Sequence, residues 1–437
     1  MKKLLTKYLP LILALLCSSA LVAQQPLTLQ QCRELALQHN EDLKHADNAL
    51  LQAEMDKQIA FASYLPQLDG SLMGVYGKDI DLMGMSTIQM HGMWMAGLTL
   101  TQPLYVGGQI TTGNKLAAVG LKAKQELLRK TRAEVIKEVD NGYWTLIAVQ
   151  EKVKMLQAFE RQMNALYDQV QLSVDAEMAT ENDLLRIATK QSEIKYQLQK
   201  AQNGVELCRM ALCSTLGLDL TDQLQLVDTE ITAQAPINLD EDISARPEVA
   251  LLQQQLEVSK YQVKMAKSGY LPTVALQLGY NHLDNMKIKG FAQDAEGNYQ
   301  PYTRNHYNNS TTAMLSVQVP LFHWGSEVKK VKKARLDVRN AELDLQKNTR
   351  LLGIEARQAV QNLTSGYQMI ETSRLGRDQA DQNLANMQLK YDNEMCTLTD
   401  LLDAESQWQQ ARSNEIEALT QYKIYETEYL RVTGRLD

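Results

Sequence analysis

Cysteine, histidine and acidic side chains are the groups in this chain that could do chemistry, as metal ligands, disulfides, nucleophiles or acid–base pairs. The six histidines show no HxxxH or HExxH spacing, and the sequence has no GxxxxGKS or GxxxxGKT loop for a nucleotide. The acidic pairs fall at expected helix ends rather than converging. No CxxC occurs among the cysteines beyond residue 23, which are Cys32, Cys208, Cys213 and Cys396. We therefore expect no enzymatic activity, no metal and no cofactor.

The N-terminus has the composition of a secretory signal. Lys2 and Lys3 precede an apolar stretch from Leu9 to Leu16, and small residues follow as far as Ala23, which is the order of a cleaved leader. We predict a signal peptide over residues 1–23. Cys17 leaves lipidation open, although the bulky Leu16 before it differs from the small residue of lipoprotein signals.

Charge and hydropathy exclude several classes of protein. The formal charge is −7, and removal of Lys2, Lys3 and Lys7 with the signal leaves about −10. An acidic surface does not favour nucleic acid, because phosphate binding needs basic side chains. No later run approaches the roughly 18 apolar residues of a membrane helix. The mature chain is therefore expected to be soluble outside the cytoplasm or to enter a membrane as a β-barrel.

The chain contains an internal tandem duplication. Gln171–Leu185 and Gln388–Leu402 share nine of fifteen residues at an offset of 217, and Gly217 recurs at that offset as Gly434. The Tyr-Leu-Pro at Tyr64 recurs after 206 residues, so one loop of the second copy is expected to be 11 residues longer. We divide the mature chain into a first structural repeat, 24–217, an acidic connector, 218–245, and a second repeat, 246–437.

Each repeat predicts the same order of elements: helix, strand, loop, strand, very long helix, break and second helix. The first helix is expected from about Leu29 to Phe61, and its counterpart from Pro247 to Ser268. The long helices are expected from near Asn114 to Val174 and from Ser326 to Tyr391. About 60 residues of helix would extend roughly 90 Å, which no globular domain needs.

Apolar residues in the long helix and the returning helix of the first repeat are spaced by fours and threes. An average step of 3.5 residues predicts coiled-coil packing between antiparallel helices. The seam comprises Val135, Val139, Gly142, Leu146, Val149, Val153 and Leu156, and on the returning helix Ile187, Gln191, Ile194, Leu198, Ala201, Val205, Cys208 and Leu212.

The expected strands alternate with a period of two. In Val274–Tyr280, Leu315–Leu321 and Trp94–Leu100 one face is apolar and the other small or polar. Polar loops are expected at Lys78–Met90 and Asn285–Asn309, opposite short junctions, an asymmetry typical of outer-membrane barrels. Four strands cannot close a barrel, and each unpaired backbone group in lipid costs several kcal/mol, so the chain would have to oligomerise. The alternative is a soluble four-stranded sheet packed on the helices.

The motifs QPLYVGG (Gln102–Gly108), PLFHWG (Pro320–Gly325) and RPEV (Arg246–Val249), with DLL after each helix break, resemble the TolC family of outer-membrane efflux proteins. The similarity covers nearly the whole mature chain. It implies an α+β membrane protein, in which a long antiparallel coiled-coil α-helical barrel joins a transmembrane β-barrel of four strands per subunit, twelve in a homotrimer. The barrel-to-tunnel junctions would be at Pro103, Gly107, Gly108, Pro320 and Gly325.

The resemblance also implies a function, localisation and partners. The chain would be the outer-membrane channel of a tripartite efflux pump or a type I secretion system in a Gram-negative bacterium, with its helical part in the periplasm. It would passively conduct drugs, small molecules or polypeptides after docking to a periplasmic adaptor and an inner-membrane transporter, with outer-membrane lipid around its barrel. An alternative is a periplasmic coiled-coil adaptor or spacer without a pore.

The family's functional residues map onto the helix breaks. Asp400 and Asp403 match the aspartates that narrow the aperture, and Asp183 and Tyr391 match a link between neighbouring helices. Asp183 and Asp400 could instead simply cap helices. Cys396 replaces an arginine of the family's closing contact, and Glu177 and Glu394 replace the usual glycine of each break. The adaptor-contacting tip would comprise Glu177, Met178, Ala179, Thr180, Glu394, Met395, Cys396 and Thr397.

Overall fold

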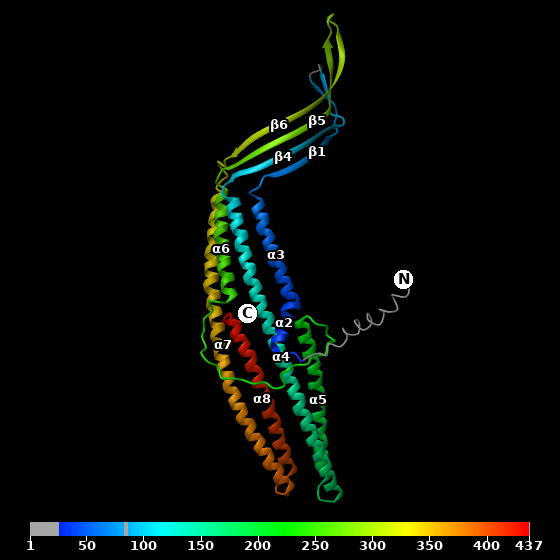
Figure 1. Ribbon diagram of the computed structural model, residues 1–437, viewed down its shortest axis with the longest axis vertical. Helices are drawn as coiled ribbons and strands as arrows, with labels where there is room; N and C mark the ends of the chain where they lie inside the picture. The colour runs from blue at the N-terminus through cyan, green and yellow to red at the C-terminus, as the bar shows by residue number, and fades with distance from the viewer. Residues whose placement is uncertain (1–25, 83–85, 437) are drawn as a thin grey trace, which may run out of the picture. The chain divides into compact units, whose positions relative to one another are not determined.

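A computed structural model describes residues 26–82 and 86–436. The expected signal peptide, residues 1–23 with Cys17, lies outside them. The elements of the first part are α2 (Leu29–His39), α3 (Glu41–Ala62), β1 (Gln67–Val75), β2 (Ile80–Leu82), β3 (Ser86–Gln89), β4 (Met93–Val106), α4 (Gln109–Asp175) and α5 (Glu181–Leu216). Those of the second are α6 (Pro247–Ser268), β5 (Thr273–Gln293), β6 (Tyr299–Gln318), α7 (Ser326–Asp392) and α8 (Leu398–Val432) (Figure 1). Among the described residues, no helix has an apolar stretch of the length and purity that crossing a bilayer requires.

The chain folds into two compact units, and each is built from both halves of the sequence. Residues 26–48, 126–250 and 347–436 form the first, which we call the helical unit. Residues 49–82, 86–125 and 251–346 form the second, the hairpin unit, which holds all described strands together with the helix ends that adjoin them. Every contact discussed below lies within one unit.

The two halves of the chain repeat one order of elements. Helices α3 and α6 are each 22 residues long and begin 206 residues apart, and α4 and α7 are each 67 residues long and begin 217 apart. The expectation of a single helix from Leu29 to Phe61 was wrong, because the chain breaks at Asn40 into α2 and α3. By the same offset of 206, α2 corresponds to residues 235–245, which contain no helix.

Asn40 explains the break between α2 and α3. Its backbone is extended (φ −60°, ψ 132°), and its side-chain oxygen accepts hydrogen bonds from the amides of Asp42 (2.9 Å) and Leu43 (3.2 Å). An asparagine that satisfies the first free amides of α3 favours a new helix start over continuation of the old one. Its side-chain amide donates to the Thr215 carbonyl (3.1 Å), which ties this start to the end of α5.

The predicted seam is the core of the helical unit. Val139 and Leu146 of α4 are buried with Leu212 of α5 in one apolar cluster, and Leu156 is buried with Ala201 in the next. The glycine in the seam, Gly142, lets α5 approach closely, because a Cβ there would lie 3.3 Å from a methyl of Leu212. The second copy buries Ala356, Leu363 and Ile370 of α7 against Tyr422, Tyr429 and Val432 of α8.

A buried ion pair joins three helices of the helical unit. Asp140 of α4 has no exposed side-chain surface and accepts two hydrogen bonds from Arg33 of α2, at 2.7 and 2.6 Å. The hydroxyl of Thr427 on α8 donates to the same carboxylate (2.7 Å). A buried charge is costly unless it is paired and hydrogen-bonded, and Asp140 meets both conditions.

The hairpin unit contains one antiparallel sheet with the long strands in the order β1–β4–β5–β6. The short strands β2 and β3 extend it, with β3 paired to β5 beyond the end of β4. The loops expected at Lys78–Met90 and Asn285–Asn309 are therefore largely strand. The 11 extra residues of the second copy lengthen β5 and β6 to 21 and 20 residues rather than forming a loop.

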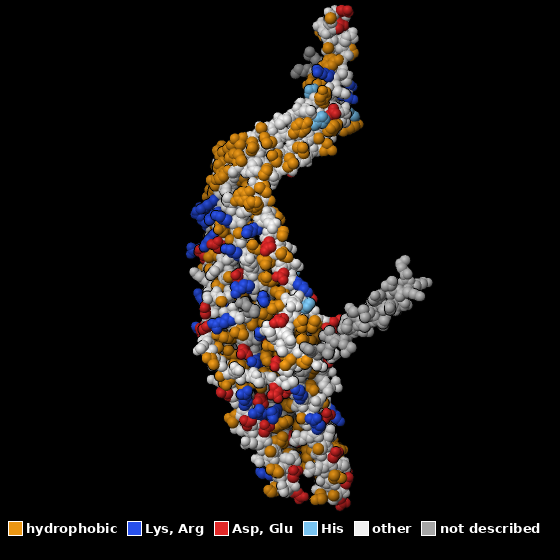
Figure 2. Space-filling view, in the orientation of Figure 1, with side chains coloured by type: hydrophobic (Ala, Val, Ile, Leu, Met, Phe, Trp, Pro, Cys, Tyr) orange, Lys and Arg blue, Asp and Glu red, His pale blue; other side chains and the backbone are white. Residues whose placement is uncertain are grey.

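The sheet exposes an apolar face. Leu68, Leu98 and Leu100 lie on it, with Leu278 opposite Leu100 and Tyr280 opposite Leu98. Leu315 of β6 lies on the same face, opposite Leu276. Leu72 is 78% exposed and Leu98 52% exposed, so helices of this chain do not cover the face as the soluble-sheet alternative requires. Figure 2 shows hydrophobic side chains gathered over the strands, and charged ones mostly over helices. Large exposed apolar patches mark surfaces that meet lipid or another protein.

Two glycines at equivalent positions close the repeats. Gly217 and Gly434 follow α5 and α8 with φ of 68° and 69°, a left-handed backbone that favours glycine. A Cβ on Gly217 would lie 2.8 Å from the His39 carbonyl, and a Cβ on Gly434 would lie 2.7 Å from that of Ala245. His39 and Ala245 are themselves 206 residues apart, so both repeats make the same contact.

We expect Gly434→Ala to lower the free energy of unfolding by at least about 2 kcal/mol, because left-handed backbone costs an alanine about 1–2 kcal/mol before any clash. Thermal unfolding of the purified protein would measure the loss. Gly376→Ala is the control: nothing lies within 4 Å of its Cβ position in α7, so it should stabilise the protein by about 0.5–1 kcal/mol. Equal melting temperatures for the two variants would contradict the contact's importance.

Candidate functional site

The two helix–helix turns of the helical unit hold the residues that the sequence singled out. We call residues 176–180 tip 1 and residues 393–397 tip 2; they join α4 to α5 and α7 to α8. In tip 1 the amide of Met178 donates to the Ser173 carbonyl (2.8 Å) and that of Glu177 to the Val174 carbonyl (2.9 Å). This pair of bonds is the Schellman helix end, and tip 2 repeats it with Met395 and Glu394.

Glutamates occupy the left-handed position of both tips. Glu177 has φ 62° and Glu394 has φ 57°, where a glycine would have no steric cost. The turn therefore keeps its geometry without the glycine, and it does so at the expense of backbone strain. Next to each glutamate a methionine projects into solvent: Met178 is 72% exposed and Met395 69%. Ala179 and Cys396 are half-buried behind them.

Asp183 and Asp400 form matching capping boxes at the starts of α5 and α8. The Asp400 carboxylate accepts from the Thr397 hydroxyl (2.6 Å) and amide (3.0 Å), while the Asp400 amide donates to the Thr397 hydroxyl (3.2 Å). Thr180 and Asp183 make the same three contacts. The hydrogen bonds from Thr397 lower the pKa of Asp400, so its charge is part of the helix start.

Asp403 lies three residues after Asp400 and therefore on the same side of α8. Its side chain is exposed, and none of the hydrogen bonds or ion pairs among described residues involves it. Asp400 is thus used by its own helix, whereas Asp403 is free. The equivalent of Asp403 in the first copy is Arg186, whose guanidinium donates to the Thr399 hydroxyl and links α5 to α8.

The structure brings Tyr391 and Asp183 close together without joining them. Burial raises the pKa of Tyr391 first, and the charges of Asp183, Cys396 and Asp392 raise it further. Within the described residues of one chain, the Tyr391 hydroxyl has no hydrogen-bond partner. The Cys396 thiol instead points back to the Met387 carbonyl (3.5 Å).

The junction residues lie in the hairpin unit where strand becomes helix. A bulge between Pro103 and Tyr105 shifts the register of β4 on β5, and the pairing continues to Val106. Gly107 and Gly108 then turn the chain with φ of 57° and 79°, and a Cβ on Gly107 would lie 2.7 Å from the Ser268 carbonyl. In the second copy, β6 ends at Gln318 before Pro320, and Gly325 (φ 75°) precedes α7.

Glu405 of α8 was not anticipated from the sequence. Its side chain is 0% exposed; one oxygen accepts from the Gln162 amide of α4 (3.2 Å), and the other has no partner. Burial raises the pKa of Glu405 to about 7, and Lys190 of α5 opposes part of that rise. The available signal was its spacing, because Glu405 stands four residues after Leu401 and three before Trp408, on the apolar side of its helix.

We expect Glu405→Gln to stabilise the protein at alkaline pH by about 2 kcal/mol. A carboxyl whose folded pKa is about 7, above its ordinary 4.5, stabilises the fold at low pH and loses that contribution as pH rises through 7. Unfolding measured between pH 5 and pH 8 should show the variant's advantage growing with pH. Glu417→Gln, an exposed site on the same helix, should leave the wild-type slope unchanged. Parallel slopes for wild type and Glu405→Gln would contradict this assignment.

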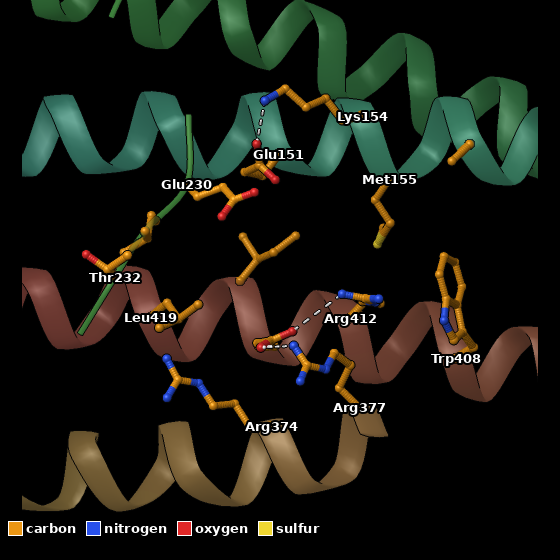
Figure 3. A pocket seen from close by; sticks show the side chains of 14 residues that line it. Glu151, Lys154, Met155, Glu230, Thr232, Arg374, Arg377, Trp408, Arg412 and Leu419 are labelled. Atoms are coloured by element: carbon orange, nitrogen blue, oxygen red, sulfur yellow. Dashed lines mark hydrogen bonds and ion pairs between the residues drawn. The ribbon is translucent and has the colours of Figure 1, made fainter. Parts of the chain in front are cut away.

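A second group of charged residues lines a cavity of about 720 Å³ between α4, α7, α8 and residues 230–232 (Figure 3). Arg377 of α7 donates to Glu415 of α8 (2.8 Å), and Arg412 lies over the Trp408 ring (5.7 Å) and pairs with Asp381 (3.4 Å). Two of its three arginines are therefore neutralised by acids between α7 and α8. These ion pairs connect α7 to α8, and this structural role explains why the charged residues are there.

Comparisons with known proteins agree with this fold. The family described as outer membrane efflux protein matches residues 32–217 and 238–435. The proteases secretion protein PrtF of Dickeya chrysanthemi is 22% identical over 417 residues, covering 89% of this chain and 84% of PrtF. The CmeC outer membrane channel of Campylobacter jejuni superimposes with a TM-score of 0.76 at 20% identity, covering 93% of this chain and 85% of CmeC. A membrane protein from Pseudomonas aeruginosa gives 0.77 at 15% identity, covering 93% of each chain.

Proposed function

The chain belongs to the outer membrane efflux protein family, and from this premise we propose that three copies of it close one channel through the outer membrane. The channel conducts its cargo passively from the periplasm to the outside. The class of cargo is that of efflux and secretion systems: drugs, other small molecules or polypeptides. The alternative of an adaptor or spacer without a pore does not fit the family.

The observation that carries this proposal is the sheet of the hairpin unit. Its apolar face is exposed, and its long edge strands, β1 and β6, each pair on one side only among the described residues. A sheet in lipid must close on itself, since each unpaired backbone group there costs several kcal/mol. Pairing β6 of one copy with β1 of the next would satisfy both edges. Three copies would supply twelve long strands, enough for a water-filled lumen.

The helical unit supports a periplasmic tunnel in the same assembly. Residues 24–217 and 246–437 would act as two repeats joined by the connector 218–245, and each repeat would contribute one strand hairpin and one antiparallel helix pair. Coiled-coil packing of the long helices would continue around the ring, because exposed apolar side chains such as Leu172, Leu207 and Leu375 have no cover in one chain.

The tips are the proposed docking surface for a periplasmic adaptor, which an inner-membrane transporter would accompany. Two equivalent exposed methionines, Met178 and Met395, sit on rigid helix ends, and flexible thioether side chains suit adaptable contacts. Glu177, Thr180, Glu394 and Thr397 surround them with polar groups. In the trimer, Asp400 and Asp403 would form rings of like charge that attract cations, and Asp183 with Tyr391 would link neighbouring helices.

We expect the detergent-solubilised mature protein to have the mass of a trimer and to conduct ions in planar bilayers. The reason is that the sheet edges of a single chain cannot be satisfied in lipid. Mass can be measured by light scattering with the detergent contribution subtracted, and conductance on the same sample. A chain that remains monomeric in buffer without detergent, and that does not bind vesicles, would contradict the proposal.

The charge rings predict cation selectivity. Asp403→Asn should reduce the cation preference measured from reversal potentials in a salt gradient, and Asp400→Asn with Asp403→Asn should reduce it further. Asp183→Asn removes the same kind of capping carboxylate from the other tip, so it controls for damage to helix starts. Unchanged selectivity in the double variant, or an equal loss in the control, would exclude the constriction.

A further inference from the structure

Methionines are concentrated in the first strand hairpin. The chain has 18 methionines in 437 residues, and six of them fall between positions 73 and 95, where an even distribution would place about one. Met83 and Met85 lie outside the described residues; Met73, Met90, Met93 and Met95 lie within them. Neither the family nor the proposed channel requires such a concentration of thioethers.

The register of the sheet brings three of these side chains to one place. Met73 of β1 is directly opposite Met95 of β4, and Met93 is opposite Val75, two residues further along the same face. Directly opposed residues on antiparallel strands have Cβ atoms about 4.5–5.5 Å apart, and next neighbours on the face are within reach of long side chains. We call Met73, Met93 and Met95 the methionine cluster.

A tight turn brings a fourth methionine to the edge of the cluster. The Met93 amide donates to the Met90 carbonyl (3.4 Å) across His91 and Gly92, and Gly92 has φ 75°. Asn285 of β5 anchors this turn through a hydrogen bond from its amide to the Gly92 carbonyl (2.9 Å). Because Gln89 pairs with Lys287, the preceding residue of β5, Met286, stands beside Met90.

The face that carries the cluster is small and polar. A Cβ on Gly97 would lie 2.6 Å from the Asn281 side chain and 2.9 Å from Ser71, so Gly97, Asn281 and Ser71 share this face with Met95 and Met73. Val75 and Leu283 are directly opposite Met93 and Met95 on this face, so these two methionines have aliphatic as well as polar neighbours. Met73 is 54% exposed, so packing alone does not account for the cluster.

Other side chains that could ligate a metal point away from the methionine cluster. The His91 ring lies against that of Tyr76 (4.0 Å between centroids, 59° between planes), and its Nδ1 lies 3.1 Å from the Gly77 carbonyl. His282 lies against Trp94 on the opposite face (5.0 Å). Among the described residues, no three His, Cys, Asp or Glu side chains gather as metal ligands. A site built only of thioethers selects soft cations over Zn²⁺, Mg²⁺ or Ca²⁺.

We propose that the methionine cluster binds a soft monovalent metal ion, Cu(I) or Ag(I), through the sulfurs of Met73, Met93 and Met95, with Met90 and Met286 at its margin. The ion is bound as such, so the step involves no oxidation, reduction or proton release. The site is complete within one chain. It stands on these side chains alone and is independent of whether three copies form a channel.

The test is a titration of the detergent-solubilised full mature protein with silver nitrate in chloride-free buffer, after accessible thiols have been blocked with N-ethylmaleimide. Calorimetry should show a saturable site of one Ag(I) per chain. The triple variant Met73→Leu, Met93→Leu and Met95→Leu keeps side-chain volume nearly constant and should bind at least about tenfold more weakly. X-ray absorption on the Cu(I)-loaded wild type should show a sulfur shell that the triple variant loses.

The matched control replaces three exposed methionines elsewhere, Met55, Met314 and Met369, with leucine. It retains the same cysteines and the same total number of methionines as the first triple variant, so it should bind Ag(I) as the wild type does. Unchanged binding by the cluster variant, or equal loss in the control, would overturn the proposal. Particle mass and ion conductance, measured without metal, should be the same for both variants, which separates failure of this site from failure of the channel.

Discussion

The structure depends on one unsatisfied requirement, the open edges of its sheet. Strands β1 and β6 each present a row of backbone donors and acceptors without a partner among the described residues. The central pairing, β4 with β5, already joins the hairpin of one repeat to that of the other over nearly the whole of β4. Duplication has thus closed two of the four edges that two separate hairpins would leave, and only the outer two remain for neighbouring copies to satisfy.

Close contacts preserve the duplication at the two glycines that end the repeats. Gly217 against His39 and Gly434 against Ala245 are the same contact made twice, and a side chain at either glycine would overlap a backbone carbonyl. Where no such approach exists, the copies have diverged: α2 occupies the place of residues 235–245, which have no helix. Steric constraint therefore accounts for the two glycines, whereas the nine identities between Gln171–Leu185 and Gln388–Leu402 fall around the exposed tips.

Much of this architecture could be predicted from the sequence, because the spacing of apolar residues and the positions of prolines depend on local backbone geometry. The bounds of α6 agree to the residue, and both long helices were expected within a few residues of their ends. The break at Asn40 was missed, although Asn40 before Glu41 and Asp42 is a local helix-start signal. The strands within 78–90 and 285–309 were missed because their many polar residues were interpreted as loops, although Ile80–Leu82 and Met286–Lys289 alternate. Glu405 is a polar residue in a buried seam. Only the packing of α4 against α8 shows that one of its carboxylate oxygens has no hydrogen-bond partner.

The tips show how one short segment can hold a rigid turn and still present charge. A capping box must keep its carboxylate on the helix amides, so Asp400 is committed to the start of α8 and its equivalent Asp183 to the start of α5. The strained glutamates show that the turn is set by these helix ends rather than by permissive backbone, since Glu177 and Glu394 adopt φ values that favour glycine. Carboxylate charge that the helix start does not use therefore has to come from another residue. Asp403, one turn further on, has no hydrogen bond or ion pair among the described residues, whereas Arg186 at the equivalent place of the first copy connects α5 to α8.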